Sequence, residues 1–311
     1  MTEREWLTCD DPMPMLGHLL RVPLSEVGRG ELDDHGNLIR GGWESSDPPP
    51  LPYPADALAT KDRVGDRALR LFACACCRRV WEVFGDDAWT IRHVPPDSSG
   101  CRTNPGPTGK LDDLFDDTLS RAAVDAAEGW CGDVVSAEQL RAAGAVAWGL
   151  AVSAYKYYGW ADYRLGDHYS ASEYDESARS YLTARAASLV CASDIQRAVG
   201  EAAQAAREAI ESRWCGQPAK PSTEWAIQAN LLRDIICNPF RPITLHTSWL
   251  TSTVLALATG IYEEKAFDRM PILADALQDA GCDNYEILNH CRGSEPHCRG
   301  CYVVDLVLGM K

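Results

Sequence analysis

Residues 67–84 read RALRLFACACCRRVWEVF, and this stretch decides the fold class. An α-helix advances about 100° per residue, so Leu69, Phe72, Cys76, Val80 and Val83 fall on one apolar stripe. Cys76 lies at the centre of that stripe and is expected to behave as a small buried hydrophobic residue. The pattern therefore predicts an amphipathic helix that packs its stripe on a core.

Two further cysteines of the same helix lie beside the stripe. Cys74 and Cys77 are spaced i and i+3, and Cys74 lies next to Trp81, so the two thiols share one flank. We expect this flank to lie off the main core face, where it can pack against a second element or hold a metal ion.

A second cysteine-rich stretch is the expected counterpart of this helix. Residues 290–301 read HCRGSEPHCRGC, and their glycines and proline predict a turn-rich loop. The two stretches carry two C-x-x-C pairs, and zinc takes four thiolate or imidazole ligands in a tetrahedron. We hypothesise that the stretches meet in space and that a zinc site uses residues from both, namely Cys74, Cys77, His297, Cys298 and Cys301.

Two alternatives to this zinc site stay open. The pairs are about 220 residues apart, whereas zinc ribbons space theirs by about 15–20 residues, so the thiols can equally be reduced core cysteines. His290 and Cys291 are additional donors near the second pair. Catalysis by a cysteine needs a cation or histidine placed to lower the thiol pKa, and no such arrangement can be assembled from the sequence.

Composition limits the class of protein. Of the 311 residues 46% are apolar, which is typical of a globular chain with a sizeable core. A net charge of −15 disfavours nucleic acid and anionic membrane as direct ligands and leaves a protein, preferably a basic one, as the expected partner. Stretches of about 18 apolar residues and an apolar leader are missing, so neither a membrane span nor export is expected. Thirteen cysteines, an odd number, then favour a reducing cytoplasm.

Helical signals recur along the chain. Few segments alternate with period two, alanine is abundant, and capping boxes occur at Thr2 with Glu5 and at Ser136 with Gln139. The predicted fold is all-α, either an irregular multi-helix bundle or a solenoid-like stack of helix pairs. Two Pro/Gly-rich loop insertions are expected near residues 27–62 and 94–111.

Domain organisation is predicted from the linkers. Residues 215–221 contain a glycine and two prolines, so we expect a helical body over residues 1–214 and a C-terminal helical subdomain over 215–311, with one continuous domain as the alternative. Residues 159–174 are expected to form an aromatic and polar loop. The helix that follows runs toward Trp214 and is too long to be continuous, so a break is expected near residues 191–194 or at Gly200.

Several stretches resemble a known family. FACACCRR from residue 72, FDRMPILADALQDAGC from residue 267 and HCRGSEPHCRGCYVVDLVLG from residue 290 are similar to an uncharacterised helical protein family abundant in planctomycete bacteria. The resemblance implies a helical fold and carries over neither an activity nor a functional residue.

The motifs that are missing from the sequence exclude several classes of enzyme. The chain lacks the nucleotide-binding, zinc-protease and serine-hydrolase patterns G-x-x-x-x-G-K-[ST], H-E-x-x-H and G-x-S-x-G, and G-x-G-x-x-G does not follow a strand. No catalytic residue is assigned, and whether the protein is an enzyme stays open. The hypotheses are a protein-interaction or regulatory module, a zinc-binding protein or metalloenzyme that uses the C-terminal Cys/His loop, and an acidic inhibitor or immunity protein for a basic enzyme.

Overall fold

The structure is a computed structural model that describes residues 1–22, 65–84, 117–164, 171–211 and 223–310, with side chains omitted between 156 and 177. Within these ranges the regular elements are helices, and no strand occurs, which confirms the all-α, multi-helix prediction. No helix of the described ranges is long and apolar enough to cross a bilayer. The predicted insertions near 27–62 and 94–111 fall on residues 23–64 and 85–116, outside the described residues.

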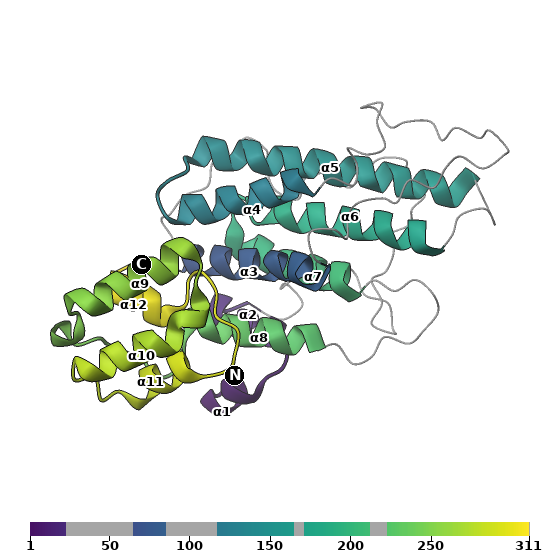
Figure 1. Ribbon diagram of the computed structural model, residues 1–311. Helices are drawn as coiled ribbons and strands as arrows, with labels where there is room; N and C mark the ends of the chain where they lie inside the picture. The colour runs from purple at the N-terminus through teal and green to yellow at the C-terminus, as the bar shows by residue number, and fades with distance from the viewer. Residues whose placement is uncertain (23–64, 85–116, 165–170, 212–222, 311) are drawn as a thin grey trace.

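The larger part of the molecule is a layered bundle (Figure 1). Its middle layer pairs the cysteine-rich helix α3 (Asp66–Phe84) with α7 (Ile195–Glu211). One side of this layer contacts α4 and α6, the α6 helix packs on α5, and the other side contacts α8. The remaining helices of this part are α1 (Glu3–Thr8), α2 (Pro12–Leu20), α4 (Thr118–Cys131), α5 (Ala137–Arg164), α6 (Ala171–Leu189) and α8 (Thr223–Ile236).

The smaller part consists of short helices that follow α8 and pack at one end of the bundle (Figure 1). Helix α10 contacts both α9 and α11, and α12 contacts α9 and α8. In chain order the elements are η4 (Thr247–Trp249), α9 (Ser252–Glu264), η5 (Phe267–Arg269), α10 (Met270–Asp279), α11 (Tyr285–Arg292) and α12 (Tyr302–Leu308).

Capping residues determine where several of the helices begin. Thr2 and Glu5 form the predicted capping box at α1, where each side chain bonds the other's backbone N–H. Ser136 and Gln139 do the same at α5. The carboxylate of Asp11 accepts from the backbone at the start of α2. These bonds satisfy amide groups that the first turn of a helix leaves without partners, so each helix begins where its capping residue lies.

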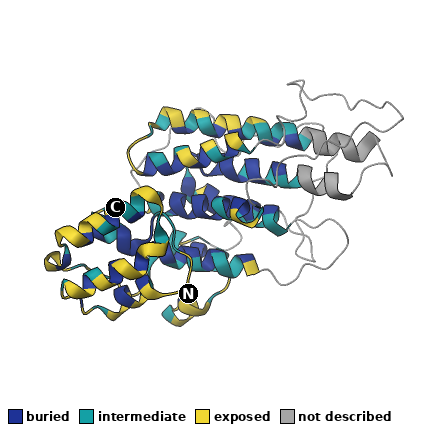
Figure 2. Ribbon diagram, in the orientation of Figure 1, coloured by how far each residue is buried: buried dark blue, intermediate teal, exposed yellow. Residues whose placement is uncertain are grey.

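Helix α3 differs from its predicted form because it is buried on nearly every side. Cys74, Cys76 and Cys77 are each at most 1% exposed, whereas Val83, expected on the apolar stripe, is 45% exposed. The flank that carries Cys74 and Cys77 therefore packs against further helices, the first of the two options predicted for it. The reason is that α3 lies between layers, so the faces outside its stripe are covered as well (Figure 2).

Two predictions on the middle of the chain have opposite outcomes. The predicted break near residues 191–194 is confirmed, because α6 ends at Leu189 and α7 begins at Ile195. The predicted loop over 159–174 is wrong at both ends, since α5 continues to Arg164 and α6 begins at Ala171. Residues 160–164 contain no proline, and one glycine costs a helix only about 1 kcal/mol, so α5 continues past Gly159 to Arg164.

The described residues contain two hydrophobic cores (Figure 2). The first extends in sequence from Trp6 to Ile235, and the second from Trp249 to Val307. Helix α8 contributes its buried side chains to the first core, although it follows residue 215. The division into 1–214 and 215–311 stays a prediction; the hydrophobic cores themselves separate after α8.

A fully buried cation joins α3 to the end of α6. Arg70 is 0% exposed, and its guanidinium donates to the carbonyl of Val190 and, at 3.0 Å, to that of Ala192. Its charged group also lies 4.7 Å from the ring centroid of Trp130. The carbonyls belong to the break between α6 and α7, where they have left the helical ladder, so Arg70 satisfies acceptors that the core would otherwise leave unpaired.

Arg70→Lys is therefore expected to lower the free energy of unfolding by about 2–3 kcal/mol, because an ammonium cannot reproduce the planar two-donor geometry and leaves a buried carbonyl unpaired. Urea unfolding followed by circular dichroism measures this change. The control is Arg197→Lys, at a side chain that is 80% exposed, where a change within about 0.5 kcal/mol is expected. Equal effects at the two positions would contradict the assigned role of Arg70.

Candidate metal centre

The last turn of α8 supplies a buried carboxylate with four contacts. Oδ1 of Asp234 lies 2.7 Å from Nδ1 of His297 and 3.1 Å from Nε2 of His290. Its Oδ2 accepts from the backbone N–H of Cys298 at 2.9 Å and lies 3.4 Å from the thiol of that residue. A carboxylate that is 3% exposed needs such partners, since burying an unpaired charge is costly.

Helix α11 orients the first histidine. Asn284 caps the helix by accepting from the amides of Glu286 and Ile287, and His290 then lies in the last turn. The imidazole of His290 packs against the rings of His297 and Tyr302, with centroids 4.8 and 4.4 Å away. These contacts hold the ring so that Nε2 faces Asp234.

The loop between α11 and α12 supplies the other two donors. The side chain of His297 is 6% exposed, and Cys301, directly before α12, is completely buried. The Cys301 sulfur lies 3.3 Å from Nε2 of His290 and 4.0 Å from Nδ1 of His297. A turn at Arg299 and Gly300 reverses the chain so that Cys301 faces the histidines.

Together these residues form a group of four donors. The ligand atoms of Asp234, His290, His297 and Cys301 all lie within 4.8 Å of one another. A tetrahedral ion at about 2.0–2.3 Å from each ligand separates nitrogen and oxygen ligands by about 3.3 Å and a sulfur from a nitrogen by about 3.6 Å. The closest pair, at 2.7 Å, is shorter than this, and the Cys301 sulfur lies 4.0 Å from Nδ1 of His297, which is longer, so the donors have to shift for tetrahedral coordination. This buried group could hold a metal ion.

The charge states of the group follow from burial and hydrogen bonding. Burial opposes ionisation of Asp234, but hydrogen bonds from His290 and His297 outweigh it and lower its pKa to about 2. Burial, with the Asp234 charge adding to it, raises the pKa of the Cys301 thiol well above its usual value. The cluster therefore presents one carboxylate and one neutral thiol, and a bound metal ion is what would convert that thiol to a thiolate ligand.

The loop is anchored to the first core by an ionic network. The buried Glu128 of α4 accepts from Arg299 of the loop at 3.4 Å, from Lys265 at the end of α9 at 2.9 Å, and from Arg78 of α3 at 3.0 Å. Arg299 also donates to the carbonyl of Tyr262 and lies over its ring. One carboxylate thus connects both parts of the molecule at the edge of the donor group.

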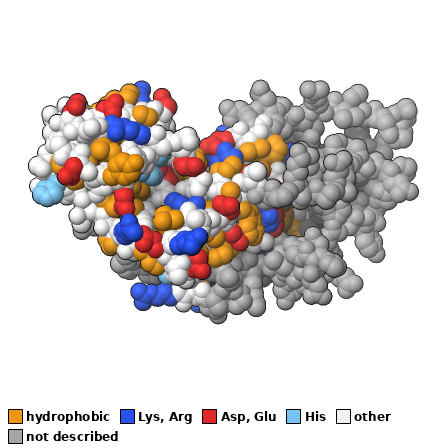
Figure 3. Space-filling view, turned by 90° about the horizontal axis from the view of Figure 1, so that it is seen from below, with side chains coloured by type: hydrophobic (Ala, Val, Ile, Leu, Met, Phe, Trp, Pro, Cys, Tyr) orange, Lys and Arg blue, Asp and Glu red, His pale blue; other side chains and the backbone are white. Residues whose placement is uncertain are grey.

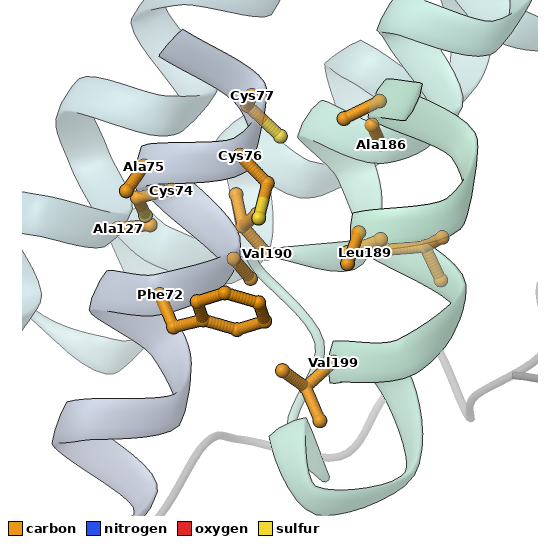
Figure 4. Close-up of a cluster of buried hydrophobic side chains, with 14 of the residues drawn as sticks. Phe72, Cys74, Ala75, Cys76, Cys77, Ala127, Ala186, Leu189, Val190 and Val199 are labelled. Atoms are coloured by element: carbon orange, nitrogen blue, oxygen red, sulfur yellow. The ribbon is translucent and has the colours of Figure 1, made fainter. Parts of the chain in front are cut away.

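The two cysteine-rich stretches do meet, as the sequence predicts, but through other residues. Gly300 lies against Leu71 of α3, and Cys298 packs on the first core. Cys74 and Cys77 are not in the group of four donors; Figure 4 shows them on α3 among buried apolar side chains, with Cys74 beside Ala127. Burial raises the pKa of both thiols, as expected for core cysteines.

The structure thus sorts the predicted ligands into three classes. His297 and Cys301 belong to the donor group, Cys298 contacts it through Asp234, and Cys74 and Cys77 lie elsewhere, so for these two metal ligation stays a prediction without geometric support. Asp234 was missed, and His290 had been noted only as a nearby donor. In sequence Asp234 resembles any acidic residue of an amphipathic helix, and its one distinguishing signal is a place three residues after Leu231, on the apolar side of α8.

The close approach of the loop to α3 predicts a specific effect of a methyl group. Gly300 has φ +100°, and an added Cβ would lie 2.9 Å from Cδ1 of Leu71. Gly281 has a similar φ of +91° with nothing within 4 Å of an added Cβ, so it is a matched control. Gly281→Ala is expected to cost about 1–2 kcal/mol from backbone strain, and Gly300→Ala about 2 kcal/mol more from the clash. Urea unfolding of both variants measures the difference, and equal losses would contradict tight packing of the loop on α3.

Comparison of the chain with protein-family models, with curated proteins and with solved structures found no match. The resemblance to the planctomycete family therefore stays a prediction. Function has to be inferred from the chemistry of the four donors.

Proposed function

We propose that this chain is a zinc-binding helical protein in which Asp234, His290, His297 and Cys301 hold one structural Zn²⁺ ion. The observation that carries the proposal is the mutual approach of four donor atoms of zinc-binding types within 4.8 Å in a buried position. The ion would join the end of α8, which belongs to the first core, to α11 and the start of α12, which belong to the second.

The donor types favour zinc among the common cations. Ca²⁺ and Mg²⁺ prefer oxygen ligands throughout, and copper(I) and iron–sulfur centres prefer several soft sulfurs. Two imidazoles, a thiolate and a carboxylate match the ligands that zinc takes in proteins. The charges also balance, because the ionised Asp234 and a Cys301 thiolate neutralise a divalent ion, and a neutral centre is the least costly to bury.

The number of donors favours a structural over a catalytic site. Structural zinc sites use four protein ligands, whereas catalytic sites use three and leave a position for water or substrate. Four side chains are in reach here, so a metalloenzyme would require one of them to be displaced. The outer contacts are also those of a fixed site, since the backbone of Cys298 holds the second oxygen of Asp234.

The other two functional hypotheses stay proposals that draw less support. For an interaction or regulatory module, the structure offers scattered exposed apolar side chains such as Tyr285 and Ile272, which are ordinary on protein surfaces. An acidic inhibitor needs carboxylates gathered on one face. On the described part of the face in Figure 3, acidic and basic side chains are interspersed instead.

Elemental analysis of the full chain, purified without chelators or added metal, tests the zinc proposal. The expected result is about one zinc per chain, removable by a strong chelator and restored by added Zn²⁺. Replacement by Co²⁺ should give a thiolate-to-cobalt charge-transfer band that disappears in Cys301→Ser and persists in Cys282→Ser. A chain that neither contains zinc nor takes it up would contradict the proposal.

A further inference from the structure

The metal loop contains a second thiol placed to pair with the ligand thiol. Cys298 and Cys301 are the first and last residues of a β-turn in which the amide of Cys301 donates to the carbonyl of Cys298 at 2.9 Å. Gly300, the third residue, has the positive φ of +100° that a type II turn requires at this position. The ends of a β-turn have Cα atoms less than about 7 Å apart, and disulfides join Cα atoms about 4.4–6.8 Å apart.

Both thiols are directed to the same side of the turn. The Cys298 sulfur lies 3.4 Å from Oδ2 of Asp234, and the Cys301 sulfur belongs to the donor group that contains the same carboxylate. Because both sulfurs lie close to one carboxylate, rotation about χ1 is the movement expected to bring them together. A disulfide therefore fits the turn.

Charge leaves Cys298 outside the metal's ligand set. One carboxylate and one thiolate already neutralise a divalent ion, and a second thiolate would give the buried centre a net negative charge, which is costly. Cys298 is thus assigned as a contact of Asp234 and not as a fifth ligand. It remains available for chemistry when the metal is bound.

The pair can be reached by a small oxidant. Cys301 is completely buried, but Cys298 is only partly buried, and residues 292–296 directly before it in the loop are exposed. We take the exposed segment 292–296 as the side from which a small peroxide enters, passes Cys298 and reaches Cys301, whereas Cys74, Cys76 and Cys77 are enclosed in the first core.

We propose that Cys298 and Cys301 form a peroxide-oxidised thiol pair whose disulfide removes one ligand from the metal centre. The metal-release part of this inference rests on the proposed function. The Cys301 thiolate attacks one oxygen of hydrogen peroxide, which forms a sulfenic acid and releases hydroxide. The Cys298 sulfur then attacks the oxidised sulfur, the S–S bond forms, and the sulfenic hydroxyl leaves with the thiol proton as water. The two sulfurs together lose two electrons, and the peroxide gains them.

Oxidation is expected to weaken zinc binding, because a disulfide sulfur carries no negative charge and three donors remain. Loss of an outer-shell partner alone lowers metal affinity about 10–100-fold, so loss of a direct ligand should exceed about 100-fold. Reduction restores both thiols and hence the site. The turn would therefore make zinc occupancy respond reversibly to peroxide.

Tryptic mapping gives a direct test on the full, zinc-loaded chain. Trypsin cleaves after Arg292 and Arg299, so Cys298 lies in peptide 293–299 and Cys301 in peptide 300–311. After treatment with hydrogen peroxide, the two peptides should be recovered joined, and zinc release measured with a colorimetric chelator should rise in parallel. A phosphine reductant should separate the peptides and allow zinc to rebind.

The matched variants are Cys298→Ser, which keeps the four proposed ligands, and Cys282→Ser, a buried cysteine of the same core outside the donor group. Cys298→Ser should still bind zinc but form no joined peptide. Under peroxide it should release zinc at least about tenfold more slowly than the wild-type chain, or release it irreversibly. Cys282→Ser should behave as the wild type in each measurement. Separate peptides after oxidation, or reversible release from Cys298→Ser at the wild-type rate, would overturn the inference. If the wild-type chain binds no zinc, the proposed function fails, and mapping of the peptides alone still decides whether the pair forms.

Discussion

If Cys301 is a ligand of the proposed zinc ion, Cys301→Ser is expected to lower the affinity for zinc by more than about 100-fold. This corresponds to about 2.7 kcal/mol of zinc-dependent stability at a fixed zinc concentration above the dissociation constant. Serine nearly keeps the size of the side chain, but a hydroxyl replaces the sulfur that lies 3.3 Å from His290 and that would be the thiolate ligand of the ion. The loss therefore reports ligation and not a cavity. Competition with a chromophoric chelator measures the affinity, and urea unfolding with and without zinc measures the stability.

The control for this effect is Cys282→Ser, at a thiol that is 3% exposed in the same core. Both variants place a hydroxyl in an apolar environment and should lose a similar, zinc-independent amount of stability. Only Cys301→Ser should lose the difference in free energy of unfolding between the zinc-loaded and the chelator-treated protein. If both variants retain that difference, Cys301 is not a ligand, and the proposed centre has to be assigned to other donors.

Glu128→Gln is expected to lower the free energy of unfolding by about 3–5 kcal/mol, the range found when one partner of a buried ion pair is removed. Glu128 is 5% exposed and pairs with Arg78, Lys265 and Arg299, which belong to three separate segments. The neutral amide of glutamine removes the negative charge that these three cations share. Its own N–H groups also face the N–H groups of the cations, with which they cannot form hydrogen bonds. Urea unfolding of the variant tests the prediction.

The pH dependence gives a second measurement on Glu128. Burial opposes its ionisation, but the hydrogen bond and charge of Arg78, followed by those of Lys265, outweigh it, so its pKa in the folded protein is lowered. A carboxyl with a lower pKa in the folded than in the unfolded state stabilises the fold above the unfolded value of about 4.3 and loses this contribution as the pH falls through the folded value. The stability difference between wild type and Glu128→Gln should therefore shrink below about pH 4. Glu138→Gln, at an exposed position of α5, should stay within about 0.5 kcal/mol of wild type throughout.

Features that depend on neighbouring residues were predictable from sequence. The capping boxes at Thr2 and Ser136 and the break between α6 and α7 follow from bonds and length limits within a few residues of each position. Periodicity was informative for the same reason, because it reports which residues share a face. It could not report that α3 is covered on its other faces, since the helices that cover it come from distant segments.

The candidate site was predictable only in part. Residues 290–301 contain many cysteines and histidines in a short stretch, which predicts a metal site there. Two of the predicted ligands, His297 and Cys301, belong to the group of four donors. Asp234 lies 63 residues before His297, and its only distinguishing mark is its place on the apolar side of its helix. Conversely, the C-x-x-C spacing of Cys74 and Cys77 matches a metal motif, but both thiols pack in the core on a helix that is buried on nearly every side.

The separation of the two hydrophobic cores has a consequence for biosynthesis. Helix α8 completes the first core, and its carboxylate is translated well before the histidines and the thiol that surround it in the finished protein. During synthesis the Asp234 carboxylate therefore precedes the side chains that later bury it, and capture of the proposed zinc ion would have to wait until residue 301 has left the ribosome. A nascent chain stalled between α9 and α11 should consequently be insensitive to zinc, although most of its tertiary structure is already in place.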